Sequence, residues 1–500
     1  MSHVRFLCAF IFRSLARKGR QTWIALFSIP SPFVGRGERV AEGRVRGVRL
    51  TGNNLLAGPV LWFVSLLFFL HPSLCGHLDA AEWRPVGVAR VDITPDYPVR
   101  LSGYGSRRAE HEGVEQRIFA KALAIGSDTD GPAVLLTVDN CGVSAAMRSE
   151  VVRRLAAKTK VTNERLAICS SHTHSAPMVN GVLPNLFSMD LPPEHLTNID
   201  RYTRELTDKL EQVALAALAD RQPGTLAWTV GKVEFARNRR GIQSTPNGVG
   251  PVDHDLALLR VADPEGRPRA VLVNYACHCT TVGFNRIHGD WAGSAQQFIE
   301  ADFPGAIALT AIGCGADQNP YPRGTFELAD QHGRALAGEA RRLLAGKLTP
   351  ITGKVAFRTK SIELPFDKLP TRAELEERAK NSSPNIAYIA KKNLARLDRG
   401  ESLPTKLPYL VQAWSFGDDL AMVFLPGEVV VDYTLRLKRE FESSRIWVNA
   451  YANDVPCYIP SERVLREGGY EGEGAMVYYD RPAKFAPGVE DRKASCRERV

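Results

Sequence analysis

Short, nearly continuous apolar runs recur along the chain and predict buried β-strands. The clearest of them are residues 166–169, 270–277, 306–312, 420–425 and 446–448. Apolar runs of this length, bounded by polar or glycine-containing segments, are typical of strands that are covered on both faces. The pattern therefore predicts a β-sheet buried inside the protein.

Longer segments between these runs have the spacing of amphipathic helices. Apolar side chains recur every three or four positions in residues 196–219 and again in residues 326–345. Strands that alternate with helices favour an α/β fold over a β-sandwich. We therefore predict one large α/β domain over residues 81–490, with a mixed β-sheet covered by helices. A charged segment at residues 371–403 predicts a pair of surface helices.

Polar side chains follow the predicted strands directly. In chain order these are His172 and His174, His278, Glu428 and Tyr458. Open α/β sheets bind ligands beyond the carboxyl ends of their strands, so we expect these side chains to share one crevice. An isolated histidine pair would fit a polar loop equally well, but the other strand ends favour a metal site. Nitrogen and oxygen donors of these types suit a catalytic zinc that keeps an open position.

Together with further motifs, these residues resemble the neutral, non-lysosomal ceramidases. The resemblance covers about residues 86–489 and extends over the catalytic domain only, without the family's C-terminal immunoglobulin-like domain. Its motifs, in the family's order, are VDITP at 91–95, GYG at 103–105, HTHS at 172–175, Asn238-Arg239, His278 with Thr280 and Thr281, Gly289-Asp290, Pro426-Gly427-Glu428, and Tyr458 with Tyr470-Glu471-Gly472.

The resemblance implies roles for individual residues. The implied ligands of one zinc ion per chain are His172, His278, Glu428 and Tyr458. The implied catalytic residues, which contact the substrate or assist at its scissile amide, are His174, Arg239 and Tyr470. Without the resemblance, Arg239 would be assigned to an exposed basic run. Tyr470 lies in a glycine-rich loop that could also serve as a lid.

One segment departs from the family pattern. Where ceramidases carry a serine in a GDxSPN-like segment, residues 316–321 read Ala-Asp-Gln-Asn-Pro-Tyr, so Asn319 replaces the hydroxyl. A carboxamide can donate a hydrogen bond but cannot act as an alcohol nucleophile. We expect Asn319 and Asp317 to belong to the substrate pocket. Asp317 could instead orient a ligand histidine or cap the following turn.

The N-terminal part of the chain predicts export. Residues 54–70 are apolar, follow an Arg-rich segment and precede Ala80 and Ala81, which is typical of a secretory signal. We therefore expect cleavage near Ala81 and a secreted or periplasmic protein, with residues 1–80 as leader and signal. Residues 1–50 lack a lasting hydrophobic period, which a mis-chosen start codon would explain. Residues 491–500 form an atypical tail.

Charge and cysteine content exclude two other classes of protein. Residues 1–80 contain ten Lys or Arg and three Asp or Glu, so the net charge of +9 falls to +2 for the remainder. A nucleic-acid-binding protein would need a basic surface on its folded part. Seven of the nine cysteines follow the leader, and their odd number and irregular spacing argue against a disulfide scaffold.

The sequence thus predicts a zinc-dependent amidohydrolase that cleaves a small-molecule or lipid N-acyl substrate, ceramide-like, by metal-activated water. With a lipid substrate we expect transient contact with a membrane surface, while the oligomeric state is left open. The alternatives are a zinc esterase or lactonase for another acyl compound, and a non-catalytic secreted binding protein of the same fold. Substrate profiling and metal-dependent turnover distinguish the three.

Overall fold

The computed structural model describes residues 82–240, 250–441 and 445–490. Within these residues nine strands form one sheet: β1 (Arg84–Asp92), β2 (Phe119–Ile125), β3 (Ala133–Val138), β4 (Leu166–Ser170), β5 (Gln222–Lys232), β7 (Asp255–Ala262), β8 (Pro268–Tyr275), β9 (Ile307–Ile312) and β11 (Thr349–Ile351). Their order is β4-β3-β2-β1-β5-β7-β8-β9, with β11 paired to β5. The pairs β3–β4 and β8–β9 are parallel and the others are antiparallel, so the sheet is mixed as predicted.

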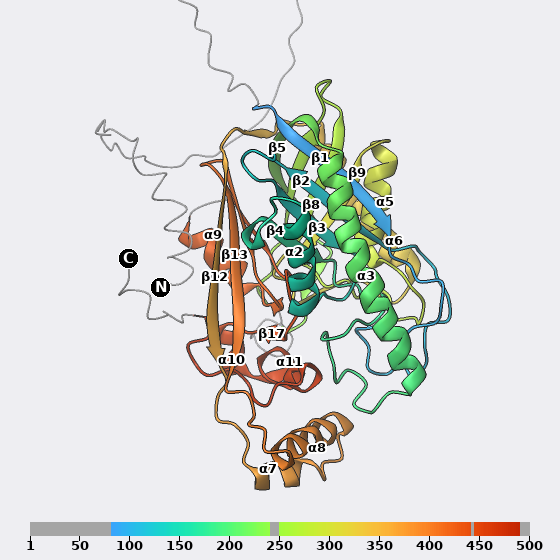
Figure 1. The fold of residues 1–500 in the computed structure, drawn as a ribbon, viewed down its shortest axis with the longest axis vertical. Coiled ribbons are helices and arrows are strands. Elements are labelled where there is room, and N and C mark those ends of the chain that lie inside the picture. Colours follow the sequence, from blue (N-terminus) through green and yellow to red (C-terminus); the bar gives the residue numbers. More distant parts are fainter. Residues whose placement is uncertain (1–81, 241–249, 442–444, 491–500) are drawn as a thin grey trace, which may run out of the picture. The chain divides into compact units, whose positions relative to one another are not determined.

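Helices cover one face of this sheet. They are α2 (Ala145–Lys158), α3 (Pro193–Ala219), α5 (Asp290–Asp302) and α6 (Phe326–Leu344). Figure 1 shows α3 lying along β1 and β2, while α5 packs on β9 and α6 on β5 and β7. The helices predicted at residues 196–219 and 326–345 correspond to α3 and α6 and are confirmed.

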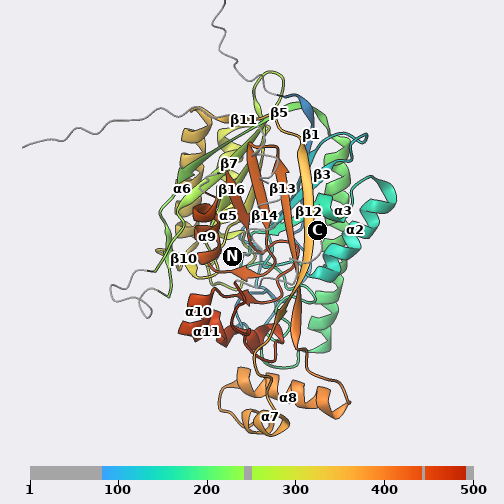
Figure 2. The ribbon, with the colours of Figure 1, turned by 90° about the vertical axis from the view of Figure 1, so that its left-hand side faces the viewer.

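A second sheet covers the opposite face, which the sequence did not predict. Its strands are β12 (Val355–Pro365), β13 (Lys406–Phe416), β14 (Leu420–Phe424) and β16 (Ile446–Asn449), which lie together in Figure 2. Trp414, Phe424 and Trp447 from this sheet join a hydrophobic cluster with Trp228 and Leu272 of the larger one. The α/β class is therefore confirmed, but helices cover only one face of the larger sheet.

Side chains of β2 alternate between the hydrophobic cluster on the helical side of the sheet and the cluster between the two sheets. Ala120, Ala122 and Ala124 join the cluster on the helical side, while Leu123 and Ile125 join the cluster between the sheets. Successive residues of a strand point to opposite faces, so a strand buried on both faces reads as a continuous apolar run. All five predicted strands, which include β14 and β16, have this character.

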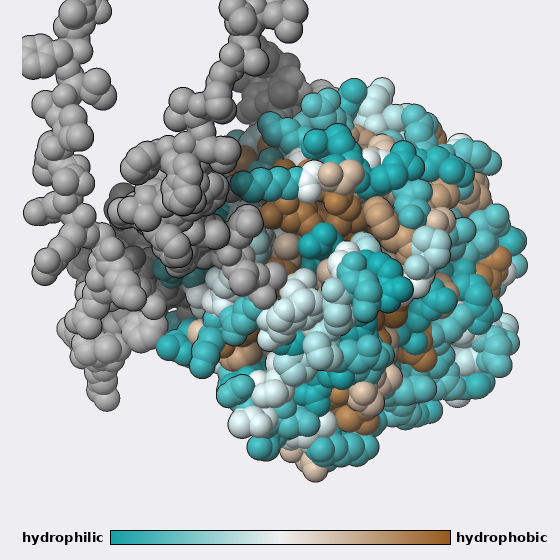
Figure 3. All heavy atoms as spheres, turned by 90° about the horizontal axis from the view of Figure 1, so that it is seen from above, coloured by the Kyte–Doolittle hydropathy of each residue, from teal (hydrophilic) through white to brown (hydrophobic). Residues whose placement is uncertain are grey.

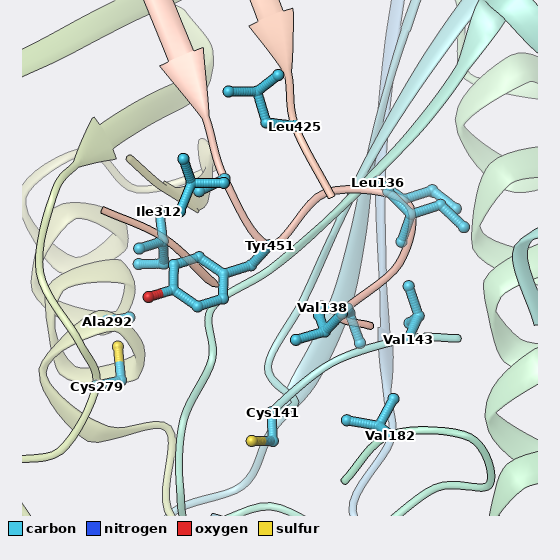
Figure 4. Packing of buried hydrophobic residues seen from close by; sticks show 14 of the residues in the cluster. Leu136, Val138, Cys141, Val143, Val182, Cys279, Ala292, Ile312, Leu425 and Tyr451 are labelled. Carbon is cyan, nitrogen blue, oxygen red and sulfur yellow. The ribbon is translucent and has the colours of Figure 1, made fainter. Parts of the chain in front are cut away.

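Several short elements connect the layers beside the strand ends. These are β6 (Ala236–Asn238), β10 (Gln318–Pro320), β15 (Glu428–Val429), β17 (Tyr458–Ile459), α9 (Asp432–Glu440), α10 (Glu462–Glu467), α11 (Gly469–Gly472) and the 3₁₀ turns η2 (Asn163–Arg165) and η3 (Gly474–Tyr479). Figure 4 shows Cys141, Cys279 and Tyr451 packed in the core next to these ends. Cys314 is also buried in this core, and burial raises the pKa of its thiol to about 12, as expected for a packing residue.

The charged segment between β12 and β13 forms the predicted helical pair, α7 (Arg372–Arg378) and α8 (Pro384–Asp398). This hairpin projects from the lower end of the molecule in Figure 1. Leu375, Ala390 and Leu403 form a small hydrophobic cluster of its own, separate from the two main ones. The hairpin therefore has a hydrophobic cluster of its own, and hydrogen bonds and an ion pair join it to the rest of the protein.

On the face shown in Figure 3, hydrophilic residues dominate and hydrophobic ones form smaller patches between them. Among the described residues, no helix combines the length and apolar character needed to cross a bilayer. The predicted signal segment and the tail at residues 491–500 lie outside the described residues.

Candidate metal centre and active site

Side chains from four distant parts of the sequence meet beyond the strand ends. His172 and His174 follow β4, and His278 follows β8. Glu428 opens β15, which pairs in parallel with β17 so that Glu428 lies directly opposite Tyr458. The crevice predicted at the carboxyl ends of the strands thus contains both histidines of the pair, the third histidine, the carboxylate and the phenol.

The backbone is shaped to bring these residues together. His172 has a φ of 57°, in the left-handed region that non-glycine residues rarely occupy, and its amide donates to the Asn140 carbonyl at 2.9 Å. Strained residues of this kind are found mainly at functional sites. Gly427 has a φ of 81°, and a β-carbon there would lie 2.5 Å from the Cys457 carbonyl oxygen. Glycine is therefore required just before Glu428.

The potential ligand atoms lie within hydrogen-bonding range of one another. Glu428 Oε2 is 3.2 Å from His172 Nε2 and 3.0 Å from His278 Nε2. Tyr458 Oη is 3.3 Å from His278 Nε2, and His174 Nε2 is 3.1 Å from His172 Nε2. His172 and His278 are fully buried, and Glu428 is almost so. The cluster is compact enough for one ion to contact several of these atoms.

The Nδ1 atoms of His172 and His278 explain why a cation suits this cluster. His172 Nδ1 lies 2.6 Å from the Cys141 carbonyl oxygen, and His278 Nδ1 lies 2.7 Å from that of Gly315. A carbonyl can only accept, so both Nδ1 atoms carry a proton, and each ring presents an Nε2 lone pair whenever it is neutral. These lone pairs and the Glu428 carboxylate all face one point. Acceptors that converge in this way fit a metal ion, with backbone carbonyls fixing the imidazoles.

The pKa values of the cluster shift in different directions. Burial lowers the pKa of His278 to about 4, and burial, with His172 and His278 beside it, holds the pKa of His174 well below its usual range. Burial would raise the pKa of Glu428, but the two neighbouring imidazoles outweigh it and hold that pKa well below normal. Burial also opposes charge on His172, but Cys141 and Glu428 outweigh it and raise the pKa of His172. A proton and a metal ion would therefore compete for His172 Nε2.

Arg239 lies on the outer side of the cluster. Its guanidinium donates to Tyr458 Oη at 3.0 Å and to Glu471 Oε1 at 2.6 Å, and lies 3.4 Å from Asn319 Oδ1. It also lies over the Tyr470 ring, 5.4 Å from its centroid. The carboxylate fixes a cation beside the phenol oxygen, so the arginine is held rather than exposed in a basic run.

Asn319 lies beside Arg239, whereas Asp317 is buried beneath the loop before α9. Asn319 Oδ1 is near Arg239 and is 3.4 Å from Thr280 Oγ1. Asp317 is fully buried and accepts from the backbone amide of Val431, just before α9, at 2.9 Å. Neither residue is among those that line the cavity at the site. Asp317 therefore joins the loop before α9 to Asn238, whose Nδ2 donates to its second carboxylate oxygen at 2.9 Å.

A cavity of about 360 Å³ opens onto the cluster. His174, Glu428, Tyr458 and Tyr470 form part of its lining. Tyr470 stands at the rim with 47% of its surface exposed, and its ring meets that of Tyr458 at 5.4 Å between centroids. Apolar side chains form another wall: Leu183, Leu186 and Phe187. The size is that of a small-molecule site, with an apolar wall opposite polar groups.

Comparison with known proteins supports the resemblance seen in the sequence motifs. Residues 85–313 match the family described as neutral/alkaline non-lysosomal ceramidase, N-terminal. Over these residues the chain is similar to the neutral/alkaline ceramidases. The resemblance predicted from the sequence motifs is thereby confirmed. The matched residues include His172, His174, Arg239 and His278, while Glu428 lies beyond them.

Curated relatives and a solved structure agree with this assignment. Neutral ceramidase of Drosophila melanogaster is 26% identical over 257 residues, which cover 48% of this chain and 35% of that protein. Neutral ceramidase of Drosophila pseudoobscura pseudoobscura is 31% identical over 252 residues, which cover 46% and 34%. The match spans about a third of the length of these relatives. The crystal structure of neutral ceramidase from Pseudomonas aeruginosa superimposes with a TM-score of 0.64 at 20% identity, covering 82% of this chain and 72% of that one, which confirms the fold.

The structure adds three residues whose part in the site sequence reasoning missed. Tyr479 donates its hydroxyl to Glu428 Oε1, and Tyr451 stacks on the His172 ring with 4.3 Å between centroids. Gly103, quoted in the GYG motif without a role, packs so closely that a β-carbon would lie 2.3 Å from the His174 ring. The motif could have suggested Gly103. No spacing pattern marks the two tyrosines.

If a zinc ion binds at this cluster through Glu428, Tyr479→Phe should weaken zinc binding by about 10–100-fold, the usual cost of losing a partner that orients a metal ligand. The Tyr479 hydroxyl occupies Glu428 Oε1 and leaves Oε2 facing the histidines. The dissociation constant of zinc should be measured by competition with a chromogenic chelator. Tyr478→Phe is the matched control, because Tyr478 bonds to Asn385 and not to the cluster. Equal zinc affinity in both variants would contradict the orienting role.

Proposed function

We propose that this ceramidase relative is a zinc-dependent hydrolase that cleaves the amide bond of a ceramide-like N-acyl substrate. The observation that carries the proposal is the convergence of His172 Nε2, His278 Nε2 and Glu428 Oε2, with both Nδ1 atoms committed to backbone carbonyls. The phenol oxygen of Tyr458 completes the proposed ligand set. The family match supports hydrolysis of an N-acyl lipid as the reaction.

A zinc ion held by these residues would supply a Lewis acid and lower the pKa of water toward about 7, which makes hydroxide available at neutral pH. His174 lines the cavity with a neutral imidazole, so it can accept a proton and pass it to the leaving amine. Arg239 and Tyr470 provide N–H and O–H donors at the outer side of the cluster. These donors would stabilise the negative charge that develops on the carbonyl oxygen.

The replacement of the family serine favours a second candidate, a zinc esterase or lactonase that uses the same apparatus on another acyl compound. Asn319 offers no hydroxyl, so a specificity that depended on that group would be lost. We further propose that the protein acts outside the cytoplasm, on the basis of the secretory signal predicted at residues 54–80. A lipid substrate would then be met at a membrane surface.

The proposal predicts that hydrolysis depends on zinc. Purified protein should turn over members of a panel of N-acyl amides and matched esters, lose that activity on dialysis against a chelator, and regain it with one equivalent of zinc. Metal content and rate should be measured on the same samples. Preference for esters over amides would favour the second candidate. Absence of zinc-dependent turnover across the panel would replace the enzyme with a binding protein of the same fold.

Asn319→Ala should retain measurable hydrolysis, with a loss of at most about 10²–10³-fold, because that is the cost of removing a single hydrogen-bond donor to an oxyanion. The side chain lies beside Arg239 and Thr280 and is not needed as a nucleophile if water attacks the carbonyl directly. The value of kcat/KM on the best substrate should be compared with wild type.

Asn319→Ser provides the matched test, since it restores the hydroxyl of the family pattern. Direct attack by water predicts that this variant resembles wild type. A large gain of activity in Asn319→Ser, or an acyl group trapped on a side chain during turnover, would contradict direct attack.

A further inference from the structure

A second hollow lies beside the catalytic cavity, beneath the α7–α8 hairpin. It has a volume of about 630 Å³ and is lined by the hairpin on one side and by η3 and the residues after it on the other. We call this hollow the hairpin groove. It shares three lining residues with the catalytic cavity, namely Asn385, Tyr470 and Tyr478. The two hollows are therefore neighbours with a common boundary.

A hydrogen-bonded bridge stands at this boundary. Ser188 Oγ donates to Asn385 Oδ1 at 2.5 Å, and Asn385 Nδ2 donates to Tyr478 Oη at 2.5 Å. Ser188 lines the catalytic cavity, whereas Asn385 and Tyr478 line both hollows. Asn385 is the central member of this Ser188–Asn385–Tyr478 bridge. Truncation of its side chain removes both hydrogen bonds at once.

The hairpin does not depend on this bridge for its attachment. Tyr388 donates to Asp190 at 2.9 Å, Lys392 donates to Asn185 at 2.7 Å, and Arg396 forms an ion pair with Asp480. The hairpin also has its own small hydrophobic cluster. Loss of the Asn385 side chain should therefore open the boundary while the hairpin stays folded and in place.

Apolar side chains that can contact an alkyl chain lie on both sides of the bridge, and in the groove they lie among charged ones such as Lys368, Arg378 and Arg481. Leu183, Leu186 and Phe187 line the catalytic cavity, and the groove adds apolar side chains from both of its walls: Ile386, Ile389, Ala390, Met476 and Val477. Each methylene that enters such a space gains affinity by leaving water. A chain too long for the catalytic cavity gains nothing further unless it can cross into the groove.

We infer that the Ser188–Asn385–Tyr478 bridge closes the catalytic cavity against the hairpin groove, and that Asn385 thereby sets the length of alkyl chain that the site accepts. This inference rests on the proposed function, and it narrows the substrate class to N-acyl amides of limited chain length. Asn385 is a specificity-determining residue and takes no part in the bond cleavage.

The test uses full-length zinc-loaded protein and two series of N-acyl amides, one varied from acetyl through octanoyl to stearoyl, the other varied in the amine chain. Wild type should lose kcat/KM beyond the medium chains of one series. Asn385→Ala should raise kcat/KM for the longest member relative to the shortest by about tenfold or more, the range that differences of single methylenes can produce in an apolar pocket.

Two variants control for effects that do not involve the bridge, namely loss of an asparagine side chain from the groove and loosening of the hairpin. Asn381→Ala changes the same residue type in the groove but not in the catalytic cavity, and should leave the chain-length profile unchanged. Tyr388→Phe removes another tether of the hairpin, to Asp190, without touching the bridge. If Tyr388→Phe shifts the profile as Asn385→Ala does, loosening of the hairpin is responsible and the inference is overturned.

The remaining outcomes are also decisive. An unchanged profile in an active Asn385→Ala variant would overturn the inference and leave the proposed function intact. If wild type hydrolyses no member of either series, the proposed function fails. The bridge is then tested by calorimetric binding of octanoate and stearate to both proteins, where Asn385→Ala must gain stearate affinity relative to octanoate.

Discussion

His278→Ala should lose both the bound zinc and the hydrolytic activity. The imidazole presents its Nε2 to Glu428 Oε2 at 3.0 Å and to Tyr458 Oη at 3.3 Å, while Gly315 holds its Nδ1. Its removal takes away one of the proposed ligands and leaves the Glu428 carboxylate buried with one fewer partner. Loss of the metal removes more than one source of transition-state stabilisation, and a single oxyanion donor alone contributes about 10²–10³-fold. We therefore expect the rate to fall by at least about 10³-fold.

The measurement is metal analysis of the purified variant beside wild type, which should contain about one zinc per chain. His195→Ala serves as the control, because His195 pairs with Arg100 and Glu110 and with none of the proposed ligands, so zinc content and rate should stay unchanged. Thermal unfolding with and without added zinc separates lost metal from lost fold, since a bound ligand stabilises the native state. Full zinc occupancy in His278→Ala would remove this residue from the ligand set.

His174→Ala should keep its zinc and lose about 10²–10⁴-fold in kcat, the usual contribution of a general acid or base. His174 lines the catalytic cavity, and its neutral imidazole is positioned against His172 by the close approach of Gly103. Its role in the proposed mechanism is to move a proton, whereas His172 and His278 hold the metal. In this variant the zinc content should therefore stay at the wild-type level while the single-turnover rate falls.

The zinc content of His174→Ala should be compared with that of His278→Ala, because the comparison separates a catalytic role from a ligand role. Each variant removes one imidazole from the same cluster, so a nonspecific effect of truncation would change zinc content in both. If His174→Ala loses zinc as readily as His278→Ala, then His174 is a metal ligand and another group must move the proton. If it keeps both zinc and rate, the catalytic role assigned to His174 is wrong.

The local pattern of the sequence determined the elements and the residue types at their ends. The continuous apolar runs became β4, β8, β9, β14 and β16, because strands buried on both faces are composed mainly of apolar residues. The helical periods became α3 and α6. Since ligands bind beyond the carboxyl ends of such strands, the histidines after β4 and β8 could be assigned to one crevice before any contact was known.

The tertiary structure alone decided which layer each strand joined and how the site was completed. Apolar runs look alike in either sheet, so periodicity could not reveal that β14 and β16 belong to a second sheet on the far face. The position of Glu428 opposite Tyr458 depends on the register between β15 and β17, and the Nδ1 partners of both histidines are backbone carbonyls that any residue could supply. Contacts of this kind join residues far apart in the chain through backbone geometry, which the order of side chains does not encode. For the same reason the sequence marked neither Tyr479 behind Glu428 nor Asn385 at the boundary of the cavity.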